Sequence, residues 1–232
     1  MRRMATVAGL SLAAMLMTSC TPTASVGDRG TTTTTSASTT TTTTPCPPAG
    51  PGADWTNCNL AGANLTGADL RGANLNETDL GLANLGGANL SNAQFNGAYF
   101  TSANFTGANL TDAAFNSING PGGTPEENTG VGPGSVFTDA NLTGTVFLSV
   151  GIGEANFTDA NLTGAMFQSA NLRDVNFTSA NLTDVKFVNG TDLTGARFTG
   201  ASLSVVASWI DVTCPDGTNS DNDGATCAND LG

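Results

Sequence analysis

The sequence has no histidine and little charge. Only 11% of its 232 residues are charged, with 7 basic and 19 acidic side chains. The absence of histidine removes the commonest general base and metal ligand, and with it any Ser-His-Asp or Cys-His arrangement. Few Lys and Arg residues argue against binding to nucleic-acid phosphates, which requires clustered positive charge. We therefore expect no catalytic residues, no cofactor-binding residues and no nucleic-acid partner.

Long apolar runs are also scarce. One run, from Val7 to Met17, follows Arg2 and Arg3 and is too short to span a bilayer. This pattern is typical of a cleaved export signal, and we predict a signal peptide over residues 1–19. The alternative is an N-terminal helix that stays buried in the fold.

The apolar run closes with Leu-Met-Thr-Ser-Cys, which resembles a bacterial lipobox. The resemblance implies that Cys20 becomes the lipidated first residue of the mature chain. The protein would then lie on the outer face of the cytoplasmic membrane or at the cell surface. Secretion without an anchor is the alternative. Export would remove Arg2 and Arg3 and leave 5 basic and 19 acidic residues, a net charge of −14, so we expect membrane contact through the lipid alone.

A low-complexity segment follows. Residues 20–45 comprise Cys20 and a linker in which Thr31 to Thr44 are all Thr or Ser apart from Ala37. Such a segment cannot bury enough apolar surface to offset the entropy of ordering, so it predicts a disordered stalk.

Four cysteines remain once Cys20 is assigned to lipid. An even number in an exported protein suggests two disulfides. Proximity in the sequence favours Cys46 with Cys58 and Cys214 with Cys227. We interpret residues 46–57 and 206–232 as disulfide-closed caps at the two ends of the folded region, with Trp55 and Trp209 as apolar lids.

The folded region is marked by a large apolar residue at every fifth position. The repeat centres run from Leu60 to Phe115, from Phe137 to Phe187 and from Leu193 to Leu203, 26 in all. A period of five matches neither the 3.6 residues of a helix nor the 2.0 of a flat strand. Ala lies two places before the centre in 18 repeats, and Asn lies directly before it in 13. Alternating large and small apolar groups can fill a narrow coil.

Units such as A-N-L-T-G, A-N-L-S-N, A-N-F-T-S and A-N-L-R-D resemble the pentapeptide-repeat family over roughly residues 53–205. The resemblance implies an all-β fold, a right-handed quadrilateral β-helix in which each repeat forms one side and four repeats complete a coil. We assign this solenoid to residues 58–205. Some members of the family resemble B-form DNA and bind DNA gyrase, which makes an acidic mimic that binds a topoisomerase an alternative, although the export signal argues against it.

Two departures from the regular pattern are informative. Phe centres alternate strictly with Leu or Ile after residue 137, which predicts Phe stacks on two opposite sides of the coil. One extra residue near Asn189 leaves this alternation intact and therefore predicts a bulge. Residues 116–134, rich in Gly and Pro, predict an exposed inserted loop.

One segment has the spacing of a calcium ligand set. Asn219, Asp221, Asp223 and Gly224 resemble the start of a calcium loop, and Asp230 falls at its twelfth position. Asn replaces the first Asp, Asp replaces the final Glu, and no helices are expected beside the loop. An acidic loop closed by Cys214 and Cys227 is the simpler interpretation, and a weakly calcium-binding adhesion module is the alternative.

Together these features predict a non-enzymatic extracytoplasmic lipoprotein whose rigid coil serves as an interaction or envelope-structural surface. The partner would be a protein or another envelope component, which the sequence leaves unidentified. The open ends of such a coil permit end-to-end or dimeric association.

Overall fold

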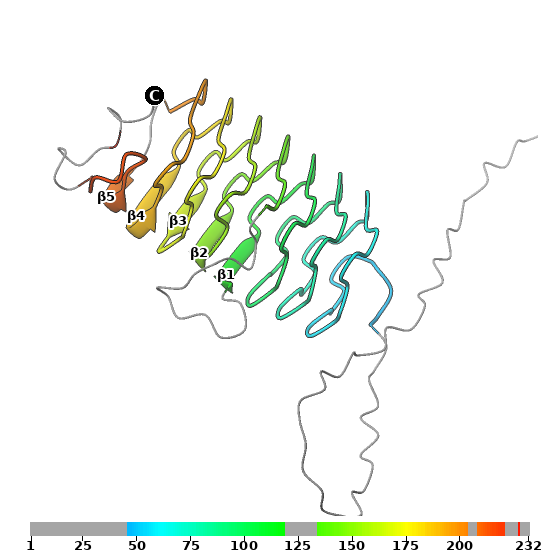
Figure 1. Ribbon diagram of the computed structural model, residues 1–232. Helices are drawn as coiled ribbons and strands as arrows, with labels where there is room; N and C mark the ends of the chain where they lie inside the picture. The colour runs from blue at the N-terminus through cyan, green and yellow to red at the C-terminus, as the bar shows by residue number, and fades with distance from the viewer. Residues whose placement is uncertain (1–45, 119–133, 204–207, 221–226, 228–232) are drawn as a thin grey trace, which may run out of the picture. The chain divides into compact units, whose positions relative to one another are not determined.

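The structure is a computed structural model that describes residues 46–118, 134–203, 208–220 and 227. No helix occurs in these residues. The five strands form one parallel sheet in the order β1-β2-β3-β4-β5, seen side by side in Figure 1. Their bounds are β1 Ala114–Ile118, β2 Val146–Val150, β3 Met166–Gln168, β4 Lys186–Asp192 and β5 Ser208–Thr213.

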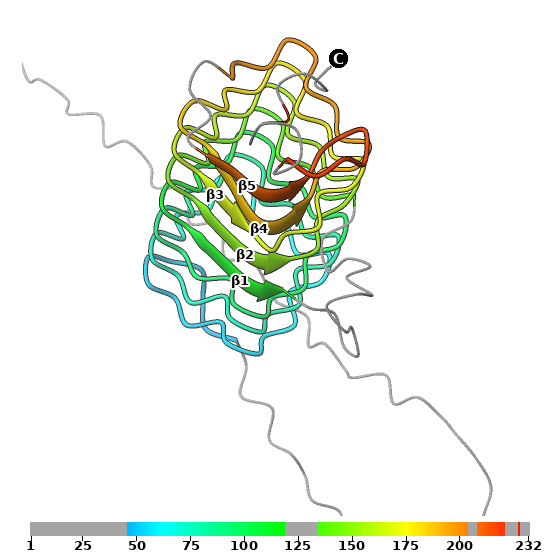
Figure 2. The same ribbon diagram turned by 90° about the vertical axis from the view of Figure 1, so that its left-hand side faces the viewer.

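The chain winds into a coil that returns to the same side every 20 residues. Isolated parallel bridges join Asp54 to Asn74, Asn59 to Asp79 and Asn64 to Asn84, and Figure 2 looks along the stacked coils. The N–H of Leu65 donates to the carbonyl of Asn84 over 2.7 Å, and the N–H of Asn84 donates to Ala63 over 2.8 Å. Four repeats therefore complete one coil, which confirms the fold class expected from the resemblance.

Each corner of the coil is a tight turn held by the repeat's own side chains. The N–H of Ala68 donates to the carbonyl of Leu65 over 3.0 Å. The Oδ1 of Asn64 accepts the backbone N–H and the hydroxyl of Thr66, at 3.2 and 2.7 Å. The next residue has a positive φ, which explains why Gly, Asn, Asp and Ser recur there. Leu82, with a φ of 59°, is the one apolar residue among the 17 described non-glycine positions of this kind.

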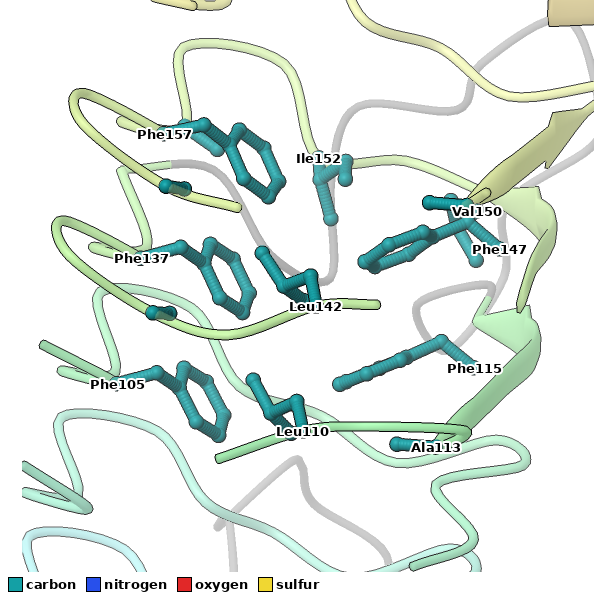
Figure 3. Close-up of a cluster of buried hydrophobic side chains, with 14 of the residues drawn as sticks. Phe105, Leu110, Ala113, Phe115, Phe137, Leu142, Phe147, Val150, Ile152 and Phe157 are labelled. Atoms are coloured by element: carbon teal, nitrogen blue, oxygen red, sulfur yellow. The ribbon is translucent and has the colours of Figure 1, made fainter. Parts of the chain in front are cut away.

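The repeat centres point inward and fill the coil. Every centre from Leu60 to Phe198 among the described residues is buried, and Leu203 packs against the same core. Neighbouring rings in the two Phe stacks are 4.3–5.3 Å apart, and part of both stacks is drawn in Figure 3. The first stack comprises Phe95, Phe115, Phe147, Phe167 and Phe187, and the second Phe105, Phe137, Phe157, Phe177 and Phe198. The prediction of stacked Phe centres is confirmed.

Two changes of chain length leave the stacks in register. The number of residues that separates two bridged positions in adjacent coils, the offset, is 20 in the first coils. It rises to 32 across the inserted segment, as between Asn109 and Asn141, and then returns to 20. A register shift between Val188 and Thr191 raises the offset to the preceding coil from 20, as between Phe167 and Phe187, to 21, as between Asn171 and Asp192. This shift confirms the predicted bulge. Strand β1 continues to Ile118, so the first residues of the predicted loop belong to the sheet; residues 119–133 lie outside the described chain.

Four polar residues occupy inward positions usually held by Ala. Thr78, Ser135, Thr145 and Thr191 are fully buried. The hydroxyls of the first three donate to the carbonyls of Trp55, Phe100 and Leu110, each over 2.8 Å, and that of Thr191 donates to Val188 over 2.9 Å. Because each hydroxyl is hydrogen-bonded, it is tolerated in an otherwise apolar core.

The register of the repeat can be tested with a matched pair of variants. Phe167→Ala should lower the free energy of unfolding by about 3–5 kcal/mol, because it leaves a cavity between two stacked rings. Thr163→Ala removes hydrogen bonds at the surface and should cost only about 1 kcal/mol. Urea unfolding followed by circular dichroism compares the two, and equal losses would show that the inward and outward positions are wrongly assigned.

Candidate interaction surfaces and end caps

The N-terminal end of the coil is closed by the segment before the first repeat. The indole Nε1 of Trp55 donates to the carbonyl of Pro47 over 2.7 Å, and the Trp55 side chain is fully buried. The disulfide between Cys46 and Cys58 ties the same segment to the first coil, with the Cα atoms 5.9 Å apart. The lid and the disulfide expected at this end are both present.

The C-terminal end is closed in a similar way on the same side of the coil. The Trp209 ring, in β5, stacks on Phe187 at 5.1 Å and ends the first Phe stack. The buried hydroxyl of Ser220 accepts the N–H of Val212 over 3.1 Å and donates to the carbonyl of Trp209 over 3.3 Å. A second disulfide joins Cys214 and Cys227, with a Cα separation of 5.4 Å.

Of the proposed calcium ligands, only Asn219 lies in the described chain. It pairs in antiparallel fashion with Thr213, and its amide donates to Asp211 over 3.4 Å. Asp221, Asp223 and Asp230 lie outside the described residues. Among the side chains the structure does place, no three of His, Cys, Asp and Glu are grouped so as to hold a metal. Calcium binding therefore stays a prediction.

Ladders of Asn and Thr cover much of the outer surface. The hydroxyl of Thr163 donates to the Oδ1 of Asn161 over 2.7 Å and accepts the amide of Asn181 from the next coil over 3.1 Å. The same pattern joins Asn176 to Asn156 and Thr158. Since these polar groups largely satisfy one another, they stabilise the coil and leave an uncharged surface.

Carboxylates lie mainly at the corners and beside the turns. Hydrogen bonds from Thr56, Arg71 and Thr218 lower the pKa of the exposed carboxyls of Asp54, Asp69 and Asp216 respectively. Burial raises the pKa of Asp192, but hydrogen bonds from Thr194 and Arg173 outweigh it, so the pKa lies below its usual range. These shifts keep the carboxyls ionised, as a solvated acidic surface requires.

The outward side of the five-stranded sheet differs from the ladders. From β2 onward, Val146, Leu148, Met166 and Val188 are half-buried on its surface, and Ile210 is 55% exposed. We call this surface the sheet face. The predictions from the sequence concerned mainly the inward positions and did not include this face. The signal is nevertheless visible in the sequence, because the residues beside Phe147, Phe167 and Phe187 are mostly apolar where other repeats have Asn and Thr.

The predicted export elements lie outside the described chain. The signal peptide, Cys20 and the Thr-rich linker all precede residue 46. Within the part that is described, no helix is long and apolar enough to cross a membrane.

The geometry defines a β-solenoid of five-residue units, closed by a disulfide at each end. A sequence model for the pentapeptide repeat region matches residues 52–119, and a second, for eight copies of the pentapeptide repeat, matches residues 155–189. Both matches support membership of the pentapeptide-repeat family. The search of curated proteins gave no match.

Several solved structures are similar to this chain. QnrB1, a plasmid-mediated fluoroquinolone resistance protein, is 17% identical over 65% of this chain and 80% of its own, with a TM-score of 0.41. HetL, a pentapeptide repeat protein involved in heterocyst differentiation regulation in the cyanobacterium Nostoc, is 20% identical over 72% of this chain and 92% of its own, with a TM-score of 0.24. A thylakoid-lumen pentapeptide repeat protein from Arabidopsis thaliana is 26% identical over 62% and 70%, with a TM-score of 0.23.

Removing the C-terminal disulfide should expose how much the cap contributes. Cys214→Ser with Cys227→Ser should lower the free energy of unfolding by about 3 kcal/mol, because the unfolded chain regains the entropy of a loop closed over 13 residues. Thermal unfolding followed by tryptophan fluorescence and by circular dichroism measures the loss. An unchanged melting temperature would contradict a stabilising role for this cap.

Proposed function

We propose that this chain is an exported lipoprotein whose pentapeptide-repeat solenoid is a rigid, non-enzymatic interaction surface outside the cytoplasm. The observation that carries the proposal is the pair of disulfides, one at each end of the coil. Structural disulfides are typical of oxidising compartments and rare in the cytosol. They agree with the export pattern of Arg2 and Arg3, the apolar run and Cys20.

The arrangement of side chains favours binding over catalysis. The interior is filled by Phe, Leu and Ala, so the repeat centres are occupied in packing one another. The chain has no histidine to serve as a general base. The described carboxylates with lowered pKa values, at Asp54, Asp69, Asp192 and Asp216, are paired with neighbours in their own turn or coil and are therefore held as anions.

The coil is suited to recognition because its surface can vary without disturbing its interior. Each side presents two outward positions per coil, spaced by the roughly 4.8 Å between stacked strands. Backbone bonds between coils hold these rows in place, as between Leu110 and Asn141 at 2.7 Å. A partner would meet a preformed surface and lose little entropy in ordering it.

Export and anchoring can be tested by fractionating cells that produce the wild type or Cys20→Ser, with a protease-accessibility assay on intact cells. We expect the wild type to be membrane-bound and accessible, and the variant to lose its membrane attachment because it cannot be lipidated. Wild type found in the cytosol with an uncleaved N-terminus would refute the proposal. The acidic surface would then make binding to a topoisomerase the next hypothesis to test.

A further inference from the structure

The sheet face changes character along one side of the coil while the backbone stays the same. In the earlier coils its outer row is an amide ladder, in which the Oδ1 of Asn76 accepts the N–H of Asn96 over 2.8 Å and the amide of Asn116 donates to Asn96 over 2.7 Å. From β2 onward the equivalent positions are Leu148, Gln168, Val188 and Ile210.

The fold itself does not require apolar residues in this row. Where the outer row changes from Asn116 to Leu148, the parallel register is kept, because Phe115 of β1 pairs with Phe147 of β2. The earlier coils form equivalent parallel bridges with Asn on the outside. Three of the four residues in this row, Leu148, Val188 and Ile210, cannot make the side-chain hydrogen bonds of the ladder and leave apolar surface in water. Contiguous surface of this kind commonly marks a site of contact with another molecule.

Over residues 114–117, 146–149, 166–169 and 186–189 the sheet face carries no acidic side chain. Asp192, at the end of β4, pairs with Asn171 on the next side, and Asp211 follows Ile210 in β5. The corner positions that follow this side are Ser117, Ser149, Ser169 and Asn189 in β1 to β4, and Asp211 in β5. In the same coils the other corners carry Asp112, Asp139, Glu154, Asp159, Asp174 and Asp184. Among the outward residues directly beside the inward Phe of β1 to β4, Lys186 is the one with a charge, and it is exposed. Apolar character and the lack of carboxylates therefore coincide on one side of the coil.

We propose that the sheet face pairs with the sheet face of a second copy of this chain. With 5 basic and 19 acidic residues in the chain from Cys20 onward, a net charge of −14, two copies repel each other, and this repulsion is least where carboxylates are absent. From β2 to β4, where it is largely apolar and free of carboxylates, the sheet face can meet its own copy about a two-fold axis, since such an interface uses the same patch twice. A single lysine does not form the basic cluster that would attract an anionic membrane.

The size of the sheet face sets the strength of the pairing. Strands about 4.8 Å apart with three to five residues each present roughly 250–400 Å² per copy. Stable interfaces bury about 800 Å² per partner, so the dimer is weak and reversible. The pairing rests on the proposed use of the solenoid as an interaction surface but not on the lipid anchor, which would only raise the effective concentration of the two copies.

The test is sedimentation equilibrium of residues 20–232 carrying Cys20→Ser, produced with both disulfides formed, over about 5–500 µM. We expect a monomer–dimer equilibrium that strengthens with added salt, because screening reduces the repulsion between acidic chains. The double variant Leu148→Asn with Val188→Asn, which restores the amides of the earlier coils, should raise the dissociation constant about ten-fold or more.

The control variant is Thr143→Asn with Thr183→Asn, which changes two similarly spaced positions on another side. It should leave the dissociation constant unchanged, and thermal unfolding should show that both variants remain folded. Ile210→Asn, at the most exposed position of the sheet face, provides a second test should the double variant unfold.

Three results would overturn the pairing: a wild type that is monomeric at every concentration, association that weakens with salt, or equal effects of the sheet-face and control variants. The last would indicate contact through the ends or another side of the coil. None of these results depends on where the protein lies in the cell, so they are separate from the fractionation of Cys20→Ser.

Discussion

The structure depends on the hydrogen bonds between one coil and the next. Each repeat donates an N–H upward and another downward, as Leu85 does to Asn104 and Asn84 does to Ala63. This arrangement forces the central residue of every side to point inward, where there is room for one large and one small group. The five-residue period, the Phe stacks and the tight corners all follow from this packing.

Because the backbone holds the coils together, the inside and the outside of the chain carry separate information. The inside is nearly uniform, and its few hydroxyls bond to carbonyls within the core. The outside differs from side to side, with amide ladders on some sides, carboxylates at several corners and the sheet face from β2 onward. A protein built this way acquires a new surface by changing residues that the fold does not use.

Much of the fold could be predicted because each repeat is an independent observation of the same local geometry. The positions of Leu and Phe, the bulge near Asn189 and both disulfides were accessible from spacing alone. The outward row from Leu148 to Ile210 was less accessible, because its neighbours in space lie 20 or more residues apart in the sequence. The buried hydroxyl of Thr78 was also missed, since its partner Trp55 is 23 residues away.

Both changes in chain length occur where the chain leaves the same side of the coil. The first change follows β1, and the extra residue of the second lies between Val188 and Thr191 in β4. In each case the next coil returns to the same columns, so Phe115 still meets Phe147 and Phe177 still meets Phe198. This corner therefore tolerates insertions of different length, because the chain re-enters the coil in a register that keeps the Phe residues stacked.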